Sequence, residues 1–273
     1  MTTKTTKPKK EKSIYNNHFI IPYNGNKRRE IKNILDYYKE DEKEPYKYII
    51  EPFAGTSCFI FHHWLKNKDK SYKYVINDLD KNLIELYELM RPCNKNKLDE
   101  LIKKCDEHLK TIDKEKYTKL YKSKTLDGFL FCSKIYSIRS GLFPTTKKIT
   151  VESFNYIYNC PIYDFFKNND HNIIITCKNG IDVIKEFNNK DCFIFIDPPY
   201  ILSENGFYKH DKVNNIYEYL CNNKIESMKS KILCCLNDNW IIKLLFKDQI
   251  KNTYNKFYDC SKETVSHNII TNY

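Results

Sequence analysis

Residues 192–200 read Cys-Phe-Ile-Phe-Ile-Asp-Pro-Pro-Tyr, an apolar run followed directly by a stiff polar turn. An uninterrupted apolar run predicts a central strand of a parallel sheet, because such a strand is buried on both of its faces. The two prolines stiffen the turn, since each fixes its φ angle and neither donates an N–H group. Ligands of parallel α/β sheets bind beyond the carboxyl ends of the strands, which is where Asp197 lies. The stretch therefore predicts a sheet with a ligand site at one edge.

Short apolar strands alternate with amphipathic helices on both sides of this stretch. This alternation predicts an α/β fold, a doubly wound, Rossmann-like parallel sheet covered by helices. The predicted helices are 30–40, 57–66, 80–90 and one from about 181, and the predicted strands are 47–51, 73–77, 172–176, 192–196, 231–236, 254–259 and 268–272.

The alternation stops between residues 91 and 170. Two lysine-rich helical stretches, 97–110 and 114–122, lead there into an aromatic segment, 128–143. A length of 273 residues suits one large domain with an insertion. The simplest division of the chain is a flexible basic arm at 1–18, one α/β domain formed by 19–87 plus 171–273, and a helical insertion at 88–170.

The chain is basic, with a formal net charge of +11. Residues 1–12 hold five lysines and one glutamate, which leaves +7 for the remainder. Basic side chains suit a polyanionic partner because they neutralise phosphates and release counterions. A solvated, lysine-rich surface encoded by an AT-rich genome explains the charge equally well. Arginine, the best bidentate reader of guanine, occurs only at positions 28, 29, 91 and 139.

Composition excludes several classes of protein. No run of about 18 apolar residues occurs, so we expect no membrane span. The lysine-rich N-terminus does not resemble a secretory signal. The 11 cysteines are scattered without a Cys-x-x-Cys pair, which favours free thiols and no metal site. We expect a soluble intracellular protein, in a bacterial cytoplasm or, for a virus, in the host-cell cytoplasm or a viral factory.

The turn at 197–200 has the groups needed to methylate an amino group conjugated to a base ring. Such a nitrogen is a poor nucleophile because its lone pair is delocalised. The Asp197 carboxylate and the Pro198 carbonyl are fixed acceptors for its N–H groups and stabilise the positive charge that develops there. Tyr200 is expected to stack on a base extruded from the duplex. The alternative is a strand-ending turn in which Asp197 only caps neighbouring amides.

A second candidate site element follows the first predicted strand. Glu51-Pro52-Phe53-Ala54-Gly55 opens a helix, and the glycine lets the backbone approach a ligand closely. Asp78 ends the next predicted strand, 23 positions after Gly55. An acidic residue at about that offset commonly accepts hydrogen bonds from a ribose hydroxyl. Each element alone is ordinary loop chemistry, but together they indicate a nucleoside-containing cofactor.

Five sequence blocks resemble those of the Dam-type family of DNA adenine-N6 methyltransferases, in the order of that family and over nearly the whole chain. They are Tyr23-Asn24-Gly25-Asn26-Lys27, Glu51-Pro52-Phe53-Ala54-Gly55, Asn77-Asp78-Leu79-Asp80, Asp197-Pro198-Pro199-Tyr200 and the C-terminal Ile269-Ile270-Thr271-Asn272-Tyr273. The resemblance implies a Rossmann-like domain that depends on S-adenosylmethionine and methylates N6 of adenine in double-stranded DNA, with no metal. It also implies that the insertion, 88–170, recognises the target.

Site residues are implied by the resemblance, position by position. The catalytic block is Asp197, Pro198, Pro199 and Tyr200, with Asp197 serving the target amine and the cofactor's ammonium. The expected contacts to the cofactor are Tyr23, Lys27 near its carboxylate, Phe53, Gly55, Asp78 at the ribose, Asp182 at the adenine amine, and Asp197. The expected contacts to DNA are Lys134 and Arg139.

A departure from the family pattern and the shared chemistry of the acceptor turn leave alternatives open. Thr56, Ser57 and Cys58 stand where the family carries further glycine, which allows a decayed enzyme that only binds nucleic acid. Other methyltransferases, acting on cytosine N4, RNA adenine or protein glutamine, use a similar rigid acceptor turn, although the family's aspartate at the first position favours adenine. A homodimer and a cognate restriction endonuclease are further partners that the sequence leaves open.

Overall fold

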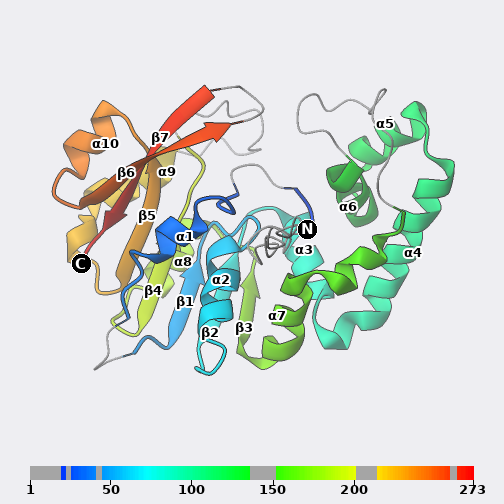
Figure 1. Cartoon of the computed structure of the whole chain (residues 1–273), viewed down its shortest axis with the longest axis horizontal. Helices are drawn as coiled ribbons and strands as arrows, with labels where there is room; N and C mark the ends of the chain where they lie inside the picture. Colours follow the sequence, from blue (N-terminus) through cyan, green and yellow to red (C-terminus); the bar gives the residue numbers. More distant parts are fainter. Residues whose placement is uncertain (1–19, 23–25, 41–44, 136–151, 201–213, 259–262) are drawn as a thin grey trace, which may run out of the picture.

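Seven strands form a single sheet in the order β3-β2-β1-β4-β5-β7-β6 (Figure 1). The computed structural model describes residues 20–22, 26–40, 45–135, 152–200, 214–258 and 263–273. The strands are β1 Tyr48–Glu51, β2 Lys73–Asn77, β3 Ile173–Thr176, β4 Cys192–Ile196, β5 Lys231–Asn237, β6 Ile250–Tyr258 and β7 Glu263–Thr271. Strands β1 to β5 pair in parallel, whereas β7 runs antiparallel to β5 and β6.

The order of the strands reverses between β1 and β4, which lie side by side at the centre of the sheet. Ile50 of β1 is in register with Val75 of β2 on one side and with Ile194 of β4 on the other. Every residue of β4 is buried, as the apolar run predicts. In an open α/β sheet, ligands bind at such a switch point, beyond the carboxyl ends of the strands. The predicted site at Asp197 lies at this edge.

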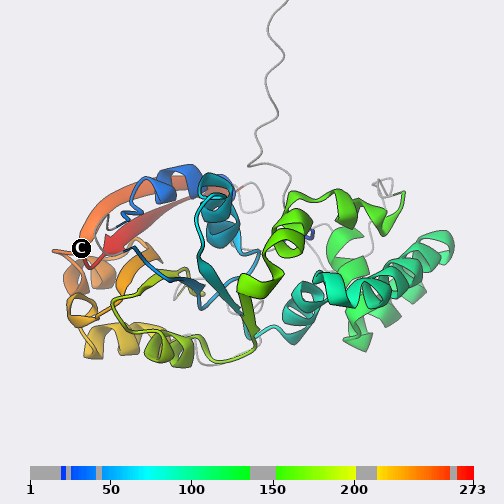
Figure 2. The same ribbon diagram turned by 90° about the horizontal axis from the view of Figure 1, so that it is seen from below.

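Helices cover both faces of the sheet (Figures 1 and 2). One face carries an apolar core shared by α1, α2 and α7, and the other a core shared by α8, α9 and α10. The α-helices are α1 Ile31–Leu35, α2 Cys58–Lys66, α3 Lys81–Leu89, α4 Lys95–Thr111, α5 Lys114–Ser123, α6 Leu126–Ile135, α7 Pro161–Asn169, α8 Gly180–Glu186, α9 Asn214–Asn222 and α10 Trp240–Leu245. No helix of the described segments is long and apolar enough to span a membrane.

Helices α4, α5 and α6 and the 3-10 helix η3 (Phe154–Asn159) form a helical segment that stands beside β3, away from the rest of the sheet (Figures 1 and 2). Its interior is apolar and includes Leu98, Phe131 and Phe154, all fully buried. Helix α7 follows it and returns to the sheet, where the Phe165 ring lies 5.4 Å from the Trp64 ring of α2. The predicted insertion, 88–170, therefore includes one helix that covers the sheet.

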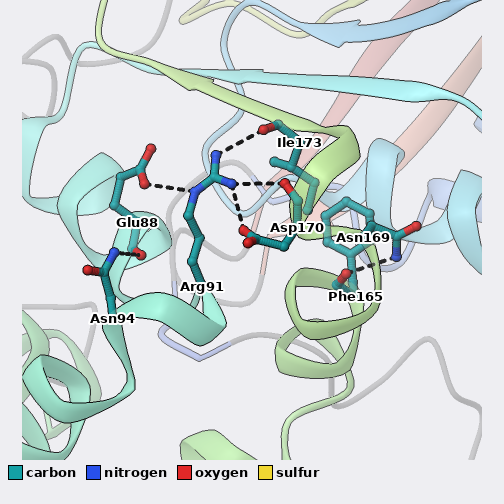
Figure 3. A network of polar contacts seen from close by, with 7 residues as sticks. All are labelled: Glu88, Arg91, Asn94, Phe165, Asn169, Asp170 and Ile173. Atoms are coloured by element: carbon teal, nitrogen blue, oxygen red, sulfur yellow. Dashed lines mark hydrogen bonds and ion pairs between the residues drawn. The ribbon is translucent and has the colours of Figure 1, made fainter.

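Arg91 joins the two ends of this excursion (Figure 3). Its Nε donates to Glu88 at 2.8 Å, and its Nη1 donates to the Asp170 carboxylate at 2.7 Å. Its Nη2 donates to the Ile173 carbonyl at 2.9 Å, at the start of β3. The chain thus leaves the α/β domain after α3 and re-enters it before β3 at points that one guanidinium holds together.

Candidate functional site

Asp197, the first residue after β4, is held by two side chains. Its Oδ2 accepts a hydrogen bond from the Lys27 ammonium at 2.6 Å, and its Oδ1 accepts one from the Tyr200 hydroxyl at 3.0 Å. Lys27 belongs to the N-terminal part of the chain and is only 2% exposed. The structure thus brings three predicted site residues into contact around one carboxylate.

The charge of Lys27 is fixed by this contact. Burial alone lowers the pKa of Lys27, but the Asp197 carboxylate more than offsets it, so the pKa is raised and the ammonium stays protonated. The ammonium also lies 5.1 Å from the centre of the Tyr200 ring, within range of a cation–π interaction. Lys27 therefore fixes both the carboxylate and the aromatic ring of the turn.

His267 of β7 forms the other side of the Tyr200 environment. It is fully buried, and its ring lies 5.1 Å from that of Tyr200 and 5.4 Å from that of Tyr254. Burial, together with the charges of Lys27 and Lys256, lowers the pKa of His267 to about 3. The imidazole is therefore neutral at physiological pH and packs as an aromatic ring. Nothing in the local sequence around His267 predicts this position.

A second ion pair lies behind the first. Lys256 of β6 contacts Glu30 at 2.5 Å and donates to the Asn26 carbonyl at 3.0 Å, and both side chains are largely buried. These bonds attach the segment that carries Lys27 to the C-terminal part of the sheet. Sequence reasoning missed both residues, because 226 positions separate them and neither lies in a recognisable motif.

The turn between β1 and α2 is closed by Glu51. Its carboxylate accepts hydrogen bonds from the Ser57 hydroxyl at 2.7 Å and from the backbone amides of Phe59 at 3.0 Å and Ile60 at 3.4 Å. It thereby satisfies orphan N–H groups at the start of α2. Burial raises the pKa of Glu51 to about 8, although these three hydrogen bonds act in the opposite direction.

Two residues of this turn have left-handed backbones, Gly55 with φ 48° and Ser57 with φ 51°. Such a conformation is ordinary for glycine and costly for serine. The Ser57 hydroxyl bond to Glu51 offsets part of that cost. The turn is therefore built without the extra glycine that the family usually carries at this point.

Asp78 follows β2 and is held by backbone amides. Its Oδ2 accepts from the Gly55 amide at 2.9 Å, and its Oδ1 accepts from the Asp80 amide at 3.0 Å. Burial raises the pKa of Asp78, while these hydrogen bonds counteract the shift. Leu79, the next residue, is 41% exposed despite its apolar side chain. The turn that contains Gly55, called the Gly-turn below, is thus hydrogen-bonded directly to Asp78, the predicted ribose acid.

Phe53 and α8 form the neighbouring wall of the site. A Cβ atom on Gly180 would lie 2.5 Å from the Phe53 ring, so only glycine at the start of α8 permits this packing. Asp182, two residues further on, is exposed in the first turn of α8. Phe53, Gly55, Asp78, Asp182 and Asp197 therefore all lie at the carboxyl edge of the sheet.

The remaining predicted site residues are placed differently. Lys134 lies on α6, in the helical segment, with its ammonium 4.0 Å from the centre of the Tyr156 ring. It is half-buried, and burial lowers the pKa of Lys134. Tyr23 and Arg139 lie outside the described residues. Across the described part of the chain, no group of three or more His, Cys, Asp or Glu side chains is arranged to hold a metal ion.

Comparison with known proteins adds to this geometry. Residues 23–256 match the sequence profile of the D12 class N6 adenine-specific DNA methyltransferases. The chain is 23% identical over 254 residues to the type II methyltransferase M.CviBI of Paramecium bursaria Chlorella virus NC1A, covering 88% of this chain and 90% of that protein. It is 25% identical over 207 residues to the type II methyltransferase M.MjaIII of Methanocaldococcus jannaschii, covering 66% and 68%.

Proposed function

The chain belongs to the D12 class of N6 adenine-specific DNA methyltransferases, and we propose that it takes its methyl group from S-adenosylmethionine bound at the carboxyl edge of the sheet. Family membership makes it a site-specific DNA adenine methyltransferase, in preference to the cytosine-N4, RNA and protein-glutamine alternatives. The observation that carries the proposal is the pair of acidic strand ends, Asp78 and Asp197, beside the turn that contains Gly55.

The residues at this edge fit S-adenosylmethionine. Asp78 keeps acceptor capacity for ribose hydroxyls, since a carboxylate has about four acceptor sites and the Gly55 and Asp80 amides occupy two of them. The exposed Leu79 beside it offers an apolar surface to a flat ring, and Asp182 lies on the adjoining helix as an acceptor for an exocyclic amine. Phe53 and Gly55 line the same edge, and Tyr23 stays a proposed contact. Bound there, S-adenosylmethionine supplies an electrophilic methyl group on a positively charged sulfur.

Asp197 and the prolines after it are proposed to hold the target amine. The Asp197 carboxylate and the Pro198 carbonyl accept its two N–H groups, and Pro199 keeps the turn stiff. The bonds from Lys27 and Tyr200 leave Asp197 further lone pairs for this purpose. As positive charge develops on N6, the negative carboxylate stabilises it. The ring of Tyr200 stacks on the extruded adenine.

Lys27 is proposed to act on Asp197 as well as near the cofactor's carboxylate. Its ammonium lies 2.6 Å from the Asp197 carboxylate and is a permanent counter-charge to it. The same contact sets the direction of the carboxylate relative to Tyr200. Loss of Lys27 should therefore affect the rate of methyl transfer and not only cofactor binding.

Target recognition is proposed for residues 88–170, with Lys134 and Arg139 among the DNA contacts. Support comes from the helical segment that stands beside β3, away from the rest of the sheet, and from the basic charge of the chain. DNA affinity is then expected to fall steeply as salt rises, because bound phosphates release counterions. A flat response in a titration by fluorescence anisotropy would remove the phosphate contacts.

Further partners follow from the names of the two relatives, which are both type II methyltransferases. These names favour a cognate restriction endonuclease that cuts the same DNA sequence. Both proteins would then act where that DNA lies, in the bacterial cytoplasm or in the host-cell cytoplasm or viral factory. Sedimentation of the purified chain with and without duplex DNA tests the proposed homodimer.

One experiment tests the reaction directly. The chain is incubated with unmethylated genomic DNA and labelled S-adenosylmethionine, and modified bases are mapped by sequencing. Label on N6 of adenine in one recurring sequence is the expected result. Calorimetry with S-adenosylmethionine alone tests the cofactor assignment, and absence of binding would favour a protein that only binds nucleic acid.

A further inference from the structure

We infer that Asn77 is a positioning residue that sets the spacing between the two loops flanking the cofactor site, an inference that rests on the proposed function. Asn77 is the last residue of β2 and is fully buried. It precedes the proposed ribose acid, Asp78, but its own side chain turns toward the neighbouring strands.

All the hydrogen-bonding capacity of the Asn77 amide is used. Its Nδ2 donates to the Pro52 carbonyl at 2.8 Å and to the Lys178 carbonyl at 3.0 Å. Its Oδ1 accepts from the Thr176 hydroxyl and from the Lys178 amide, both at 2.8 Å. Two donors and two acceptor lone pairs are the full inventory of a carboxamide.

These bonds join loops that come from different strands. Pro52 follows β1 and immediately precedes Phe53, whereas Lys178 follows β3 and lies two residues before Gly180. The backbone of Asn77 adds a further bond, since its carbonyl accepts from the Ala54 amide at 2.8 Å. One side chain thus fixes the separation of the Gly-turn and the start of α8 on either side of Asp78.

Phe53 packs directly against the start of α8, the helix that follows Lys178. The Phe53 ring already lies so close to Gly180 that a single added carbon would stand 2.5 Å from it. If Asn77 no longer tied Pro52 to Lys178, the ring and the helix would be free to separate. The contacts proposed for Phe53, Asp78 and Asp182 would then no longer be held at fixed distances from one another.

An amide is required by this arrangement. Aspartate keeps the two acceptors but has no donors for the carbonyls of Pro52 and Lys178, and it adds a buried charge. Alanine leaves four backbone and side-chain groups without their partner. If Asn77 positions the loops that contact the cofactor, its replacement should lower the affinity for S-adenosylmethionine as well as the stability of the fold.

Asn272 provides a matched control. Its Oδ1 accepts from the Ile232 amide at 2.8 Å, and its Nδ2 donates to the carbonyls of Ser230 at 2.9 Å and Met228 at 3.3 Å. These groups lie at the start of β5, at the opposite edge of the sheet from the cofactor. The two asparagines thus perform similar bonding work at opposite ends of parallel strands.

The experiment compares Asn77→Ala with Asn272→Ala in the full chain. For both variants we would measure the melting temperature and, by calorimetry, the Kd of S-adenosylmethionine. We would also measure kcat and the KM for S-adenosylmethionine, with duplex DNA as the methyl acceptor. We expect both to lower the melting temperature, but only Asn77→Ala to raise the Kd and KM for S-adenosylmethionine, by about tenfold or more. The kcat at saturating cofactor should change less than the KM.

Thr176→Val serves as a milder second variant, in case Asn77→Ala does not fold. It removes only the hydroxyl that donates a hydrogen bond to Asn77, and we expect the Kd of S-adenosylmethionine to rise about threefold. The inference is overturned if Asn77→Ala and Asn272→Ala have equal Kd values for S-adenosylmethionine. If Asn77→Ala does not fold, it is overturned if Thr176→Val has the same Kd as the unmodified chain. Absence of S-adenosylmethionine binding by the unmodified chain would instead overturn the proposed function.

Discussion

Two ion pairs of equal length lie at opposite ends of β4. Lys27 and Asp197 meet at the carboxyl end and Lys47 and Asp191 at the amino end, each with 2.6 Å between nitrogen and oxygen. The side chains of the first pair are 3% and 16% exposed, and those of the second are 70% and 48% exposed. The two pairs therefore have the same nitrogen-to-oxygen distance but differ greatly in their exposure to water.

The difference teaches that distance alone does not reveal what an ion pair does. An exposed pair contributes little to stability, because water screens it and both side chains lose freedom. A buried pair costs desolvation of both charges, so it is weak support for stability as such. The pair at the carboxyl end is best explained by the chemistry proposed for Asp197.

Substitution of Asp197 should have the largest effect on the rate of methyl transfer. Asp197→Ala should lower kcat for methyl transfer by about a thousandfold, since it removes an acceptor aimed at the developing charge on N6. The Kd for duplex DNA, measured by fluorescence anisotropy, should change little. Asp191→Ala is the matched control at the other end of β4 and should keep full activity. Comparable activity of the two variants would contradict the mechanism.

Lys27→Met should have the next largest effect, a decrease in kcat of about tenfold to a hundredfold. The variant keeps the length of the side chain but leaves the partly buried Asp197 without its counter-charge. Single-turnover kinetics at saturating S-adenosylmethionine separate this loss from weaker cofactor binding. If only the KM for the cofactor rose, Lys27 would be assigned to cofactor binding alone.

His267, whose ring packs against Tyr200 beside the buried ion pair, should make the free energy of unfolding depend on pH. The ordinary pKa of 6.5 applies in the unfolded chain, whereas burial, Lys27 and Lys256 lower the folded-state pKa of His267 to about 3. Below pH 6.5 the unfolded chain binds a proton that the folded chain does not, so the free energy of unfolding falls as pH falls. From pH 7 to pH 5 this amounts to about 2 kcal/mol.

His267→Phe keeps an aromatic ring and removes the titration. Urea denaturation at both pH values should therefore show a smaller loss of stability for the variant than for the unmodified chain. Buried His62 and His63, whose pKa values burial lowers to about 4 and about 3, continue to titrate in both proteins and provide a common background. Parallel pH curves for the two proteins would show that His267 does not titrate as described.

The smallest effect is expected for Lys47→Met, at the exposed end. Melting temperature and kcat should both stay within experimental error of the unmodified chain. A clear decrease in either quantity would mean that the amino end of β4 is more than a solvated surface, and the comparison between the two pairs would lose its basis.

Local pattern predicted much of the sheet. The strands at 73–77 and 192–196 have the predicted bounds, because each contains a buried apolar run, 74–76 in the first and 192–196 in the second, and each is followed by a polar turn. The predicted helix at 30–40 is wrong in length, since α1 ends at Leu35 and tighter turns follow at Tyr37 and Tyr38. Helices α7, α9 and α10 were not predicted, as α10 has only six residues and the other two contain aromatic residues that show no clear period.

The site was predictable only where it rests on short motifs. Asp197, Gly55 and Asp78 follow predicted strands and lie together, as expected from parallel strands that end at one edge. The contact of Lys27 with Asp197 spans 170 positions, so no local pattern indicates that the two side chains touch. Asn77, Lys256 and His267 depend in the same way on the packing of the folded chain.

Arg91 has a consequence for how such enzymes diversify. Because it clamps the exit after Glu88 to the re-entry at Asp170, the polypeptide between those points begins and ends at nearly one spot. A lineage can lengthen, shorten or replace the part of that polypeptide that precedes α7 without shifting any strand, provided that α7, the arginine and the arginine's carbonyl and carboxylate partners persist. Under the target-recognition role proposed for residues 88–170, such changes would bring new DNA sequences within reach of an unchanged catalytic edge.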